Sequence, residues 1–315
     1  MKIVDTHCDL LYKLQKAKRK NRPLDVLISN ELDTNVTRLH RGGVYVQFFA
    51  IFVPPSVSAK EKWQYAKEQV ELFHEVVCQS PNVRWIQRWE DIFSLRDDEI
   101  GAVLALEGVE AIQQDLDRLY YLYERGLRSV GLTWNEANAA ASGVQAKKDH
   151  GLTTFGEAII DFNNRNQVLT DLSHLGERSF WDVIEKAKYV FSSHSNVRAV
   201  CNHPRNLSDF QLQALFAKGG LVSLNFYPPF LQREKKNTSL ETIVAHIDYI
   251  VQLGGVSYIS FGSDFDGIDK YVLELRHAGC YQTLIDYLFL HYDEEVVRLF
   301  SYKNFERFIL QIVGE

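Results

Sequence analysis

The first residues that could do chemistry are a histidine and an aspartate near the amino terminus, His7 and Asp9. They follow residues 2–4, a short apolar run with the composition of a buried strand. On an extended backbone alternate side chains point the same way, so an imidazole and a carboxylate can face one point. Zinc accepts both kinds of ligand. The pair alone is not specific, because His-x-Asp also occurs by chance at polar strand ends.

The same residue types recur where four later apolar runs end, at Glu107, His174, His194 and Asp264. A single histidine or Glu-Gly pair at a strand end is more often part of a turn, but three histidines and several carboxylates are harder to explain in that way. The five ligands without Asp264 exceed what one tetrahedral zinc with an open position needs. They fit two metals if Glu107, alone on its strand, bridges them. A two-metal site can bind a hydroxide and polarise a carbonyl, which is hydrolysis chemistry.

Eight apolar runs must position these residues, and segments with helical periodicity separate them. The runs cover residues 2–4, 44–52, 102–106, 129–134, 168–174, 189–194, 221–227 and 258–264. This alternation predicts a single α/β domain over residues 1–315, a (β/α)8 TIM-type barrel with C-terminal helices from residue 280 onward. The active sites of such barrels lie at the carboxyl ends of the strands, where the candidates fall. A doubly wound open sheet is the alternative, but no Gly-x-Gly-x-x-Gly follows the first run.

Composition excludes several other classes of function. The 315 residues are 46% hydrophobic and 24% charged, with a net charge of −6, which argues against nucleic acid and anionic membrane surfaces as partners. The four cysteines are scattered, with no Cys-x-x-Cys pair, which suits a reducing compartment. The sequence starts without an apolar leader and has no apolar run long enough to span a bilayer. We therefore expect a cytoplasmic protein.

Taken together and in order, the motifs resemble those of the zinc-dependent renal-type (membrane) dipeptidases of the amidohydrolase superfamily, over essentially the whole chain. The motifs are Asp5-Thr6-His7-Cys8-Asp9, Leu106-Glu107-Gly108, Asp171-Leu172-Ser173-His174, Phe191-Ser192-Ser193-His194-Ser195, Asn225-Phe226-Tyr227 and Phe261-Gly262-Ser263-Asp264-Phe265-Asp266-Gly267. The resemblance implies two Zn²⁺ ions per chain. One would be held by His7, Asp9 and Glu107, and the other by Glu107, His174 and His194.

The resemblance also implies roles for residues around the metals. Asp264 matches the residue that handles the proton of the bridging water. Arg205 matches the arginine that grips the substrate carboxylate, a role suited to its bidentate guanidinium, and Tyr227 matches a substrate-pocket residue. Without the resemblance, the simpler interpretation of Arg205 would be a surface ion pair, and that of Tyr227 a half-buried aromatic side chain. The resemblance also places Trp134 in the substrate site, where mammalian members carry a histidine that stabilises the developing oxyanion. Indole can donate one hydrogen bond but cannot become a cation.

The expected function is therefore hydrolysis of free dipeptides by a metal-bridging hydroxide, with tolerance of a D-residue on the carboxyl side. An alternative keeps the metal site but acts on N-acyl amino acids or another small amide. A third interpretation is a barrel that binds metal or ligand without catalysis, which should lack a metal ligand or Asp264. Neither is missing from the sequence. By resemblance, the protein is compatible with a homodimer.

Overall fold

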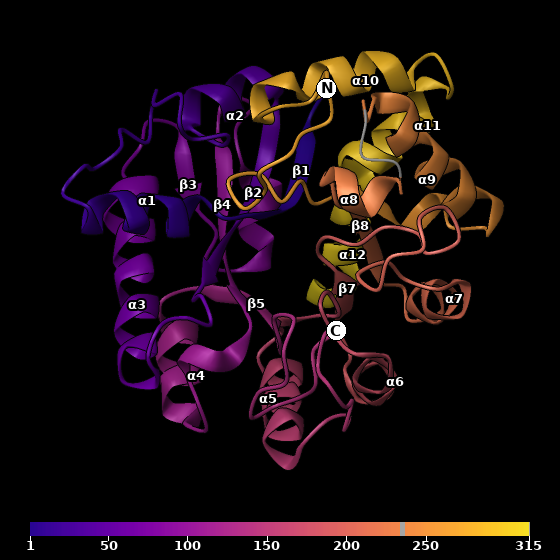
Figure 1. Cartoon of the computed structure of the whole chain (residues 1–315). Helices are drawn as coiled ribbons and strands as arrows, with labels where there is room; N and C mark the ends of the chain where they lie inside the picture. Colours follow the sequence, from indigo (N-terminus) through magenta and orange to yellow (C-terminus); the bar gives the residue numbers. More distant parts are fainter. Residues whose placement is uncertain (234–236, 315) are drawn as a thin grey trace.

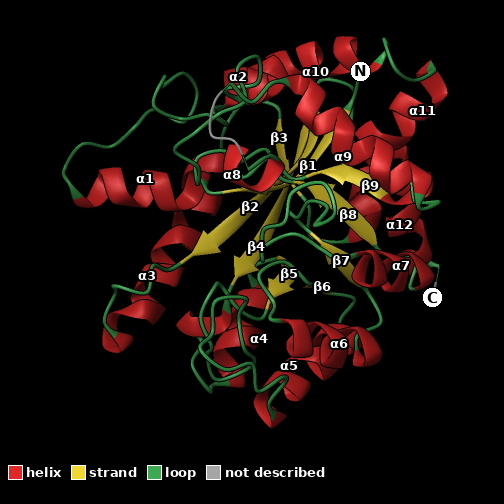
Figure 2. Ribbon diagram, turned by 45° about the vertical axis from the view of Figure 1, so that its right-hand side comes forward, coloured by secondary structure: helices red, strands yellow, loops and turns green. Residues whose placement is uncertain are grey.

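The computed structural model of the chain describes residues 1–233 and 237–314. Its parallel strands surround a central axis (Figure 2) and follow the order β2-β1-β9-β8-β7-β6-β5-β4-β3, with an additional pairing between β2 and β4. That pairing closes eight strands into a barrel, so the predicted (β/α)8 fold is confirmed. The described strands are β1 (Ile3–Cys8), β2 (Val44–Phe52), β3 (Val83–Trp85), β4 (Ile100–Glu107), β5 (Leu127–Gly131), β6 (Leu169–Asp171), β7 (Val190–Ser192), β8 (Leu221–Leu224) and β9 (Ile259–Phe261).

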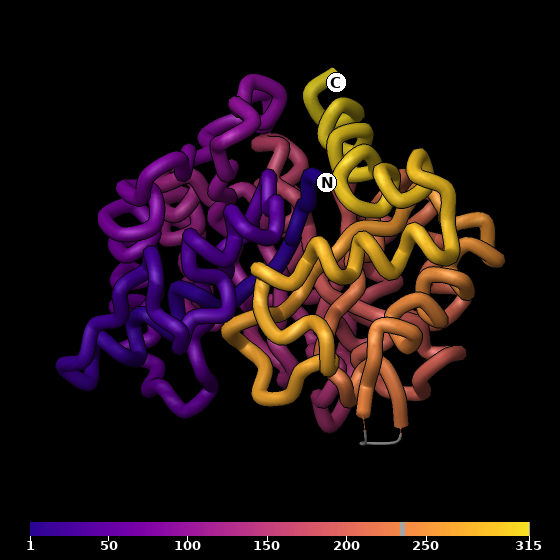
Figure 3. Tube along the Cα trace, turned by 90° about the horizontal axis from the view of Figure 1, so that it is seen from above, coloured from indigo at the N-terminus to yellow at the C-terminus, as the bar shows by residue number. Residues whose placement is uncertain are grey.

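Helices surround this barrel, as Figure 1 shows. Seen from above, the amino-terminal half of the chain forms one side of the molecule and the carboxyl-terminal half the other (Figure 3). None of the helices in the described residues has the length and apolar character needed to cross a membrane. The described α-helices are α1 (Leu10–Arg19), α2 (Val36–Gly42), α3 (Ala59–Leu72), α4 (Leu116–Glu124), α5 (Thr154–Arg165), α6 (Glu177–Lys186), α7 (Asp209–Ala217), α8 (Pro228–Leu231), α9 (Leu240–Gln252), α10 (Tyr281–Leu288), α11 (Glu294–Arg298) and α12 (Asn304–Val313).

Strand β3 was not predicted from the sequence. It pairs with the first residues of β4, Val83 opposite Ile100 and Trp85 opposite Ala102, beside the closed barrel. The strand has three residues with the charged Arg84 in the middle, and all three are only partly buried. Neither an apolar run nor a regular alternation marks so short a segment, so its strand conformation depends on the neighbouring β4.

Aromatic residues fill the amino-terminal end of the barrel. Phe48 of β2 and Phe191 of β7 point inward, and α12 covers them with Phe305 and Phe308. The ring centroids of Phe48 and Phe305 lie 5.7 Å apart, and those of Phe191 and Phe308 lie 6.4 Å apart. Burial of such large rings stabilises the fold by about 1.5–3 kcal/mol for each side chain. This end of the barrel is therefore packed with apolar groups, whereas the candidate metal ligands lie at the opposite, carboxyl-terminal end.

The polar strand ends differ from the prediction. The strands predicted to reach residues 174, 194, 227 and 264 end earlier, at Asp171, Ser192, Leu224 and Phe261. At the end of β6 the carboxylate of Asp171 accepts hydrogen bonds from the backbone N–H groups of Ser173 and Ser193. Such side-chain bonds to the backbone compete with the sheet ladder and turn the chain away from it. The residues past the strands therefore approach the barrel axis from loops.

Candidate metal centre

Six predicted residues from five strand ends converge at the carboxyl-terminal mouth of the barrel. Nε2 of His7 lies 3.5 Å from Oδ2 of Asp9, 3.8 Å from Oε2 of Glu107 and 3.9 Å from Oδ1 of Asp264. The other oxygen of Glu107, Oε1, lies 2.9 Å from Nε2 of His174 and 3.6 Å from Nε2 of His194. The two oxygens of Glu107 thus face two different groups of potential ligands.

Asp9 reaches this cluster for a different reason from the one predicted. It does not continue the extended backbone of His7, because its φ of −101° and ψ of 25° begin the turn into α1. As the residue before the helix it has no side-chain capping hydrogen bond, so its carboxylate can turn toward His7. Gly267 leaves room for this. A Cβ at that position would lie 2.1 Å from Oδ2 of Asp9 and 2.9 Å from Oδ1 of Asp264.

Hydrogen bonds to Ser193 and Asn135 fix two of the histidine rings. Ser193 donates its hydroxyl proton to the carboxylate of Asp171, so its oxygen accepts a hydrogen bond from Nδ1 of His194 at 2.7 Å. Oδ1 of Asn135 accepts a bond from Nδ1 of His174 at 2.8 Å. With both Nδ1 atoms protonated, each Nε2 carries a lone pair. These ring partners were not predicted from the sequence, although Asn135 directly follows Trp134.

The resulting geometry is suited to cations. The Nε2 atoms of His174 and His194 lie 2.9 Å apart, and two lone pairs at that distance repel each other unless a cation lies between them. Nε2 of His7 and Oδ1 of Asp9 are buried and have no hydrogen-bond partner among the described residues. Ligand atoms that share a tetrahedral zinc ion lie about 3.4 Å apart, because each is about 2.1 Å from the metal. The distances around Glu107 are close to that value, so the residues fit divalent metal ions.

Burial also sets the protonation of these groups. It raises the pKa of Glu107 well above its usual range and raises the pKa of Asp264 to about 6. Burial lowers the pKa values of His174 and His194, which keeps both imidazoles neutral, the form that ligates metals. Burial also disfavours protonation of His7, but Glu107, Asp9 and Asp264 outweigh it and raise the pKa of His7 to about 10. A divalent cation would relieve this accumulation of buried acidic groups.

The ring partners lead to a first prediction. Ser193→Ala should weaken zinc binding about 10- to 100-fold, because loss of the hydrogen-bond partner of a metal-binding histidine typically lowers metal affinity by that factor. Competition against a chelator of known affinity measures the effect. Ser260→Ala is the matched control, since Ser260 is a buried serine of β9 whose hydroxyl has no hydrogen-bond partner among the described residues. Equal zinc affinity of the Ser193 and Ser260 variants would contradict the role of Ser193.

A cavity of about 470 Å³ adjoins the cluster, and the predicted residues Arg205, Tyr227 and Trp134 line it. Arg205 is only 4% exposed, and its Nη2 donates to the backbone oxygen of His194 at 3.1 Å. Its Nε is buried and has no partner in the described part of the chain. Arg205 therefore does not form a surface ion pair. It is a buried cation next to the cavity, and its Nε–H group is unpaired among the described residues.

The other two residues form walls of this cavity. The hydroxyl of Tyr227 donates to Oδ1 of Asp269 at 3.0 Å, and both residues line the cavity. The ring of Trp134 lies between Phe52 and His174, with centroid distances of 5.4 Å and 6.2 Å. The loop of residues 135–150, which follows Trp134, contributes Asn135 and Gln145 to the lining.

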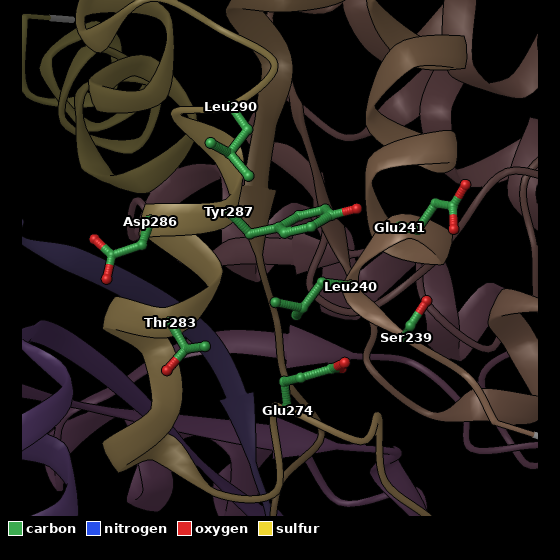
Figure 4. A pocket seen from close by; sticks show the side chains of 8 residues that line it. All are labelled: Ser239, Leu240, Glu241, Glu274, Thr283, Asp286, Tyr287 and Leu290. Carbon is green, nitrogen blue, oxygen red and sulfur yellow. The ribbon is translucent and has the colours of Figure 1, made fainter.

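A second cavity of similar size, about 510 Å³, lies away from the cluster, between the start of α9 and α10. Leu240 and Tyr287 lie near its centre in Figure 4, with the acidic Glu241, Glu274 and Asp286 around them. Among the described residues, its lining includes no histidine, no arginine and none of the candidate metal ligands. We therefore place the substrate in the cavity beside the cluster.

Three imidazoles and three carboxylates at the mouth of a closed parallel barrel are typical of metal-dependent hydrolases. The comparison with known proteins identifies which one. The model of the membrane dipeptidase family (peptidase family M19) matches residues 1–313, and the chain belongs to this family. It is therefore a metal-dependent peptide hydrolase.

The chain is also similar to individual proteins. An uncharacterised protein of Klebsiella pneumoniae is 36% identical over 245 residues, which are 70% of this chain and 90% of that protein. An uncharacterised dipeptidase of Schizosaccharomyces pombe is 30% identical over 310 residues, covering 90% of this chain and 73% of the yeast protein. A crystal structure of a Rhodobacter sphaeroides metallopeptidase, liganded with a phosphinate mimic of the dipeptide L-Ala-D-Ala, shares the fold with a TM-score of 0.90. It is 24% identical and covers 98% of both chains.

Proposed function

We propose that this protein is a dinuclear zinc dipeptidase that hydrolyses the peptide bond of free dipeptides. The main support is Glu107, whose two oxygens face separate groups of ligands, with His7 on one side and His174 and His194 on the other. We extend the proposal to dipeptides with a D-residue on the carboxyl side, because the R. sphaeroides relative was crystallised with a mimic of L-Ala-D-Ala. Assembly into homodimers stays a prediction.

In this proposal, His7, Asp9 and Glu107 hold one ion, while Glu107, His174 and His194 hold the other. Two divalent ions, when bound, would polarise the scissile carbonyl and lower the pKa of the attacking water.

Asp264 is placed to move the protons of the reaction. Asn225 donates from its Nδ2 to Oδ2 of Asp264 at 2.9 Å, which leaves Oδ1 directed toward His7. The φ of 64° at Asp264 holds its backbone in the left-handed region, where the chain turns its carboxylate back over the barrel mouth. We propose that Oδ1 of Asp264 takes a proton from the attacking water and then delivers it to the nitrogen of the leaving amine.

Arg205 is the proposed site for the α-carboxylate of the substrate. Its guanidinium is positive, almost fully buried and part of the cavity lining, so a carboxylate can pair with it in a desolvated position. The acidic Asp9 and Asp264 also line the cavity, and we propose that they favour the free amino group of a dipeptide over the neutral end of an N-acyl amino acid. Comparing hydrolysis of a dipeptide with that of its N-acetylated analogue tests this preference.

The Arg205→Ala variant provides a second prediction. Truncation of one partner of a buried charge pair costs about 2–5 kcal/mol. The variant should lose kcat/KM for dipeptides by roughly 30- to 5,000-fold, and far less for the corresponding dipeptide amides. Arg198→Ala is the matched control, because Arg198 lies on the same loop, donates to the backbone oxygen of Asn206 and does not line the cavity. Equal losses on acid and amide substrates would refute the role of Arg205.

A further inference from the structure

Strand order determines which wall of the cavity faces the amino-side residue of a bound dipeptide. Around the closed barrel, β2 and β7 are four strands apart in either direction, so they lie on opposite sides of the mouth. Arg205 contacts the backbone of His194 directly after β7, whereas Phe52 is the last residue of β2. A dipeptide whose carboxylate is bound by Arg205 would therefore extend its amino-side residue toward the ends of β1 and β2. This step rests on the proposed dipeptidase function.

The wall at that side of the cavity is aromatic. Tyr12 of α1 packs edge-on against Phe52 with a centroid distance of 5.4 Å, and Trp134 packs on the other side of Phe52 at 5.4 Å. All three residues line the cavity. Together they form a continuous surface of three rings, on which the methylene groups of a long side chain can be buried.

This aromatic wall ends in positive charge. Lys16 lies about one turn beyond Tyr12 on α1, and its Nζ is 5.9 Å from the centre of the Tyr12 ring. Lys16 and Tyr12 also line a second hollow of about 220 Å³, which continues toward Lys20 and the loop after β2. The hollow therefore adjoins the substrate cavity, with two residues common to both.

The basic side chains on α1 and directly after it are unequally neutralised. Arg19 pairs with Glu68 through two hydrogen bonds of 2.8 Å, and Lys13 pairs with Asp266 at 2.9 Å. Within the described residues, neither Lys16 nor Lys20 forms an ion pair with a carboxylate. The outer end of the wall therefore presents uncompensated positive charge to whatever lies in the cavity.

We propose that Lys16 selects the amino-side residue of the substrate by charge, and that this enzyme prefers dipeptides whose amino-side residue is acidic. The methylene groups of a glutamate in that position would pack against Tyr12 and Phe52. Its carboxylate would reach the ammonium group of Lys16. A lysine in the same position would place like charges together and bind less well.

Three dipeptides of similar size, Glu-Ala, Gln-Ala and Lys-Ala, test this inference on the zinc-reconstituted protein. For the wild type, kcat/KM should be highest for Glu-Ala, lower for Gln-Ala and lowest for Lys-Ala. Each step should be about two- to fivefold, because a partly exposed ion pair contributes at most about a factor of five. Lys16→Glu should invert the order, so that Lys-Ala becomes a better substrate than Glu-Ala. The differences should shrink as salt is added.

Lys18→Glu is the matched control for net charge. Lys18 lies on the same helix, is exposed and lines neither the cavity nor the hollow. It should leave the wild-type order unchanged. Equal rates for the three dipeptides, or the same inversion in both variants, would overturn the selection by Lys16 while leaving the dipeptidase proposal intact. Absence of hydrolysis of any dipeptide would overturn the dipeptidase proposal itself, and this inference with it.

Discussion

Replacement of Glu107 by alanine should reduce the bound metal from two ions per chain to less than one and abolish nearly all dipeptide hydrolysis. The reason is that Oε1 and Oε2 of Glu107 face different groups of ligands, so one substitution removes a ligand from both ions. Elemental analysis of the dialysed protein measures the loss. A ligand that serves one ion should cost less, and we expect Asp9→Ala to retain about one equivalent.

Glu110→Gln controls for the loss of a half-buried carboxylate in the same region. Glu110 is three residues beyond Glu107 and accepts a hydrogen bond from Nδ2 of Asn138 at 3.0 Å. It does not line the cavity beside the cluster. This variant should keep both ions. If Glu107→Ala also kept two equivalents bound, the bridging role of Glu107 would be wrong.

Asp264→Asn should lower kcat by about 10²- to 10⁴-fold, which is the usual contribution of general acid–base groups. Asparagine has nearly the same shape and can still pack beside Asn225, so metal binding and substrate binding should change little. Because chemistry is then slow, calorimetry should detect an intact dipeptide bound to the variant. Metal content, measured on the same sample, separates lost chemistry from a lost ion.

Asp269→Asn is the corresponding control for Asp264. Asp269 follows the same strand and lines the same cavity, but its carboxylate accepts a hydrogen bond from Tyr227. Its replacement should alter KM more than kcat. Turnover of the Asp264 variant near the wild-type rate, with both metals bound, would remove Asp264 from the mechanism.

The ligand types and their places at strand ends could be predicted because they depend on local sequence. An apolar run followed by a histidine or carboxylate is visible in one dimension, and parallel strands in a barrel bring their carboxyl ends together. The conformations at those ends were not predictable in the same way. His174 and Asp264 have φ values of 67° and 64°, and Asp9 begins a helix. These backbone turns depend on side-chain hydrogen bonds between different strands.

Arg205 shows the same limit from another direction. The residue type of Arg205 and its neighbours in the sequence favoured a surface ion pair, and only the family resemblance suggested a substrate contact. The segment after β7 folds back on itself, and the backbone N–H of Arg198 donates to the backbone oxygen of Leu207. Arg205 lies within this folded segment and is buried. Nothing in the local composition marks that fold-back. The ring partners Asn135 and Ser193 were likewise not identified, because their roles depend on histidines from other positions in the fold.

Titration of the metal-free protein with Zn²⁺, with dipeptide hydrolysis measured at each step, tests the dinuclear dipeptidase most directly. We predict that kcat rises to a plateau at two equivalents of zinc per chain. A plateau at one equivalent would contradict the dinuclear centre bridged by Glu107. Failure to hydrolyse dipeptides at any zinc level, with hydrolysis of N-acyl amino acids in their place, would contradict the proposed substrate.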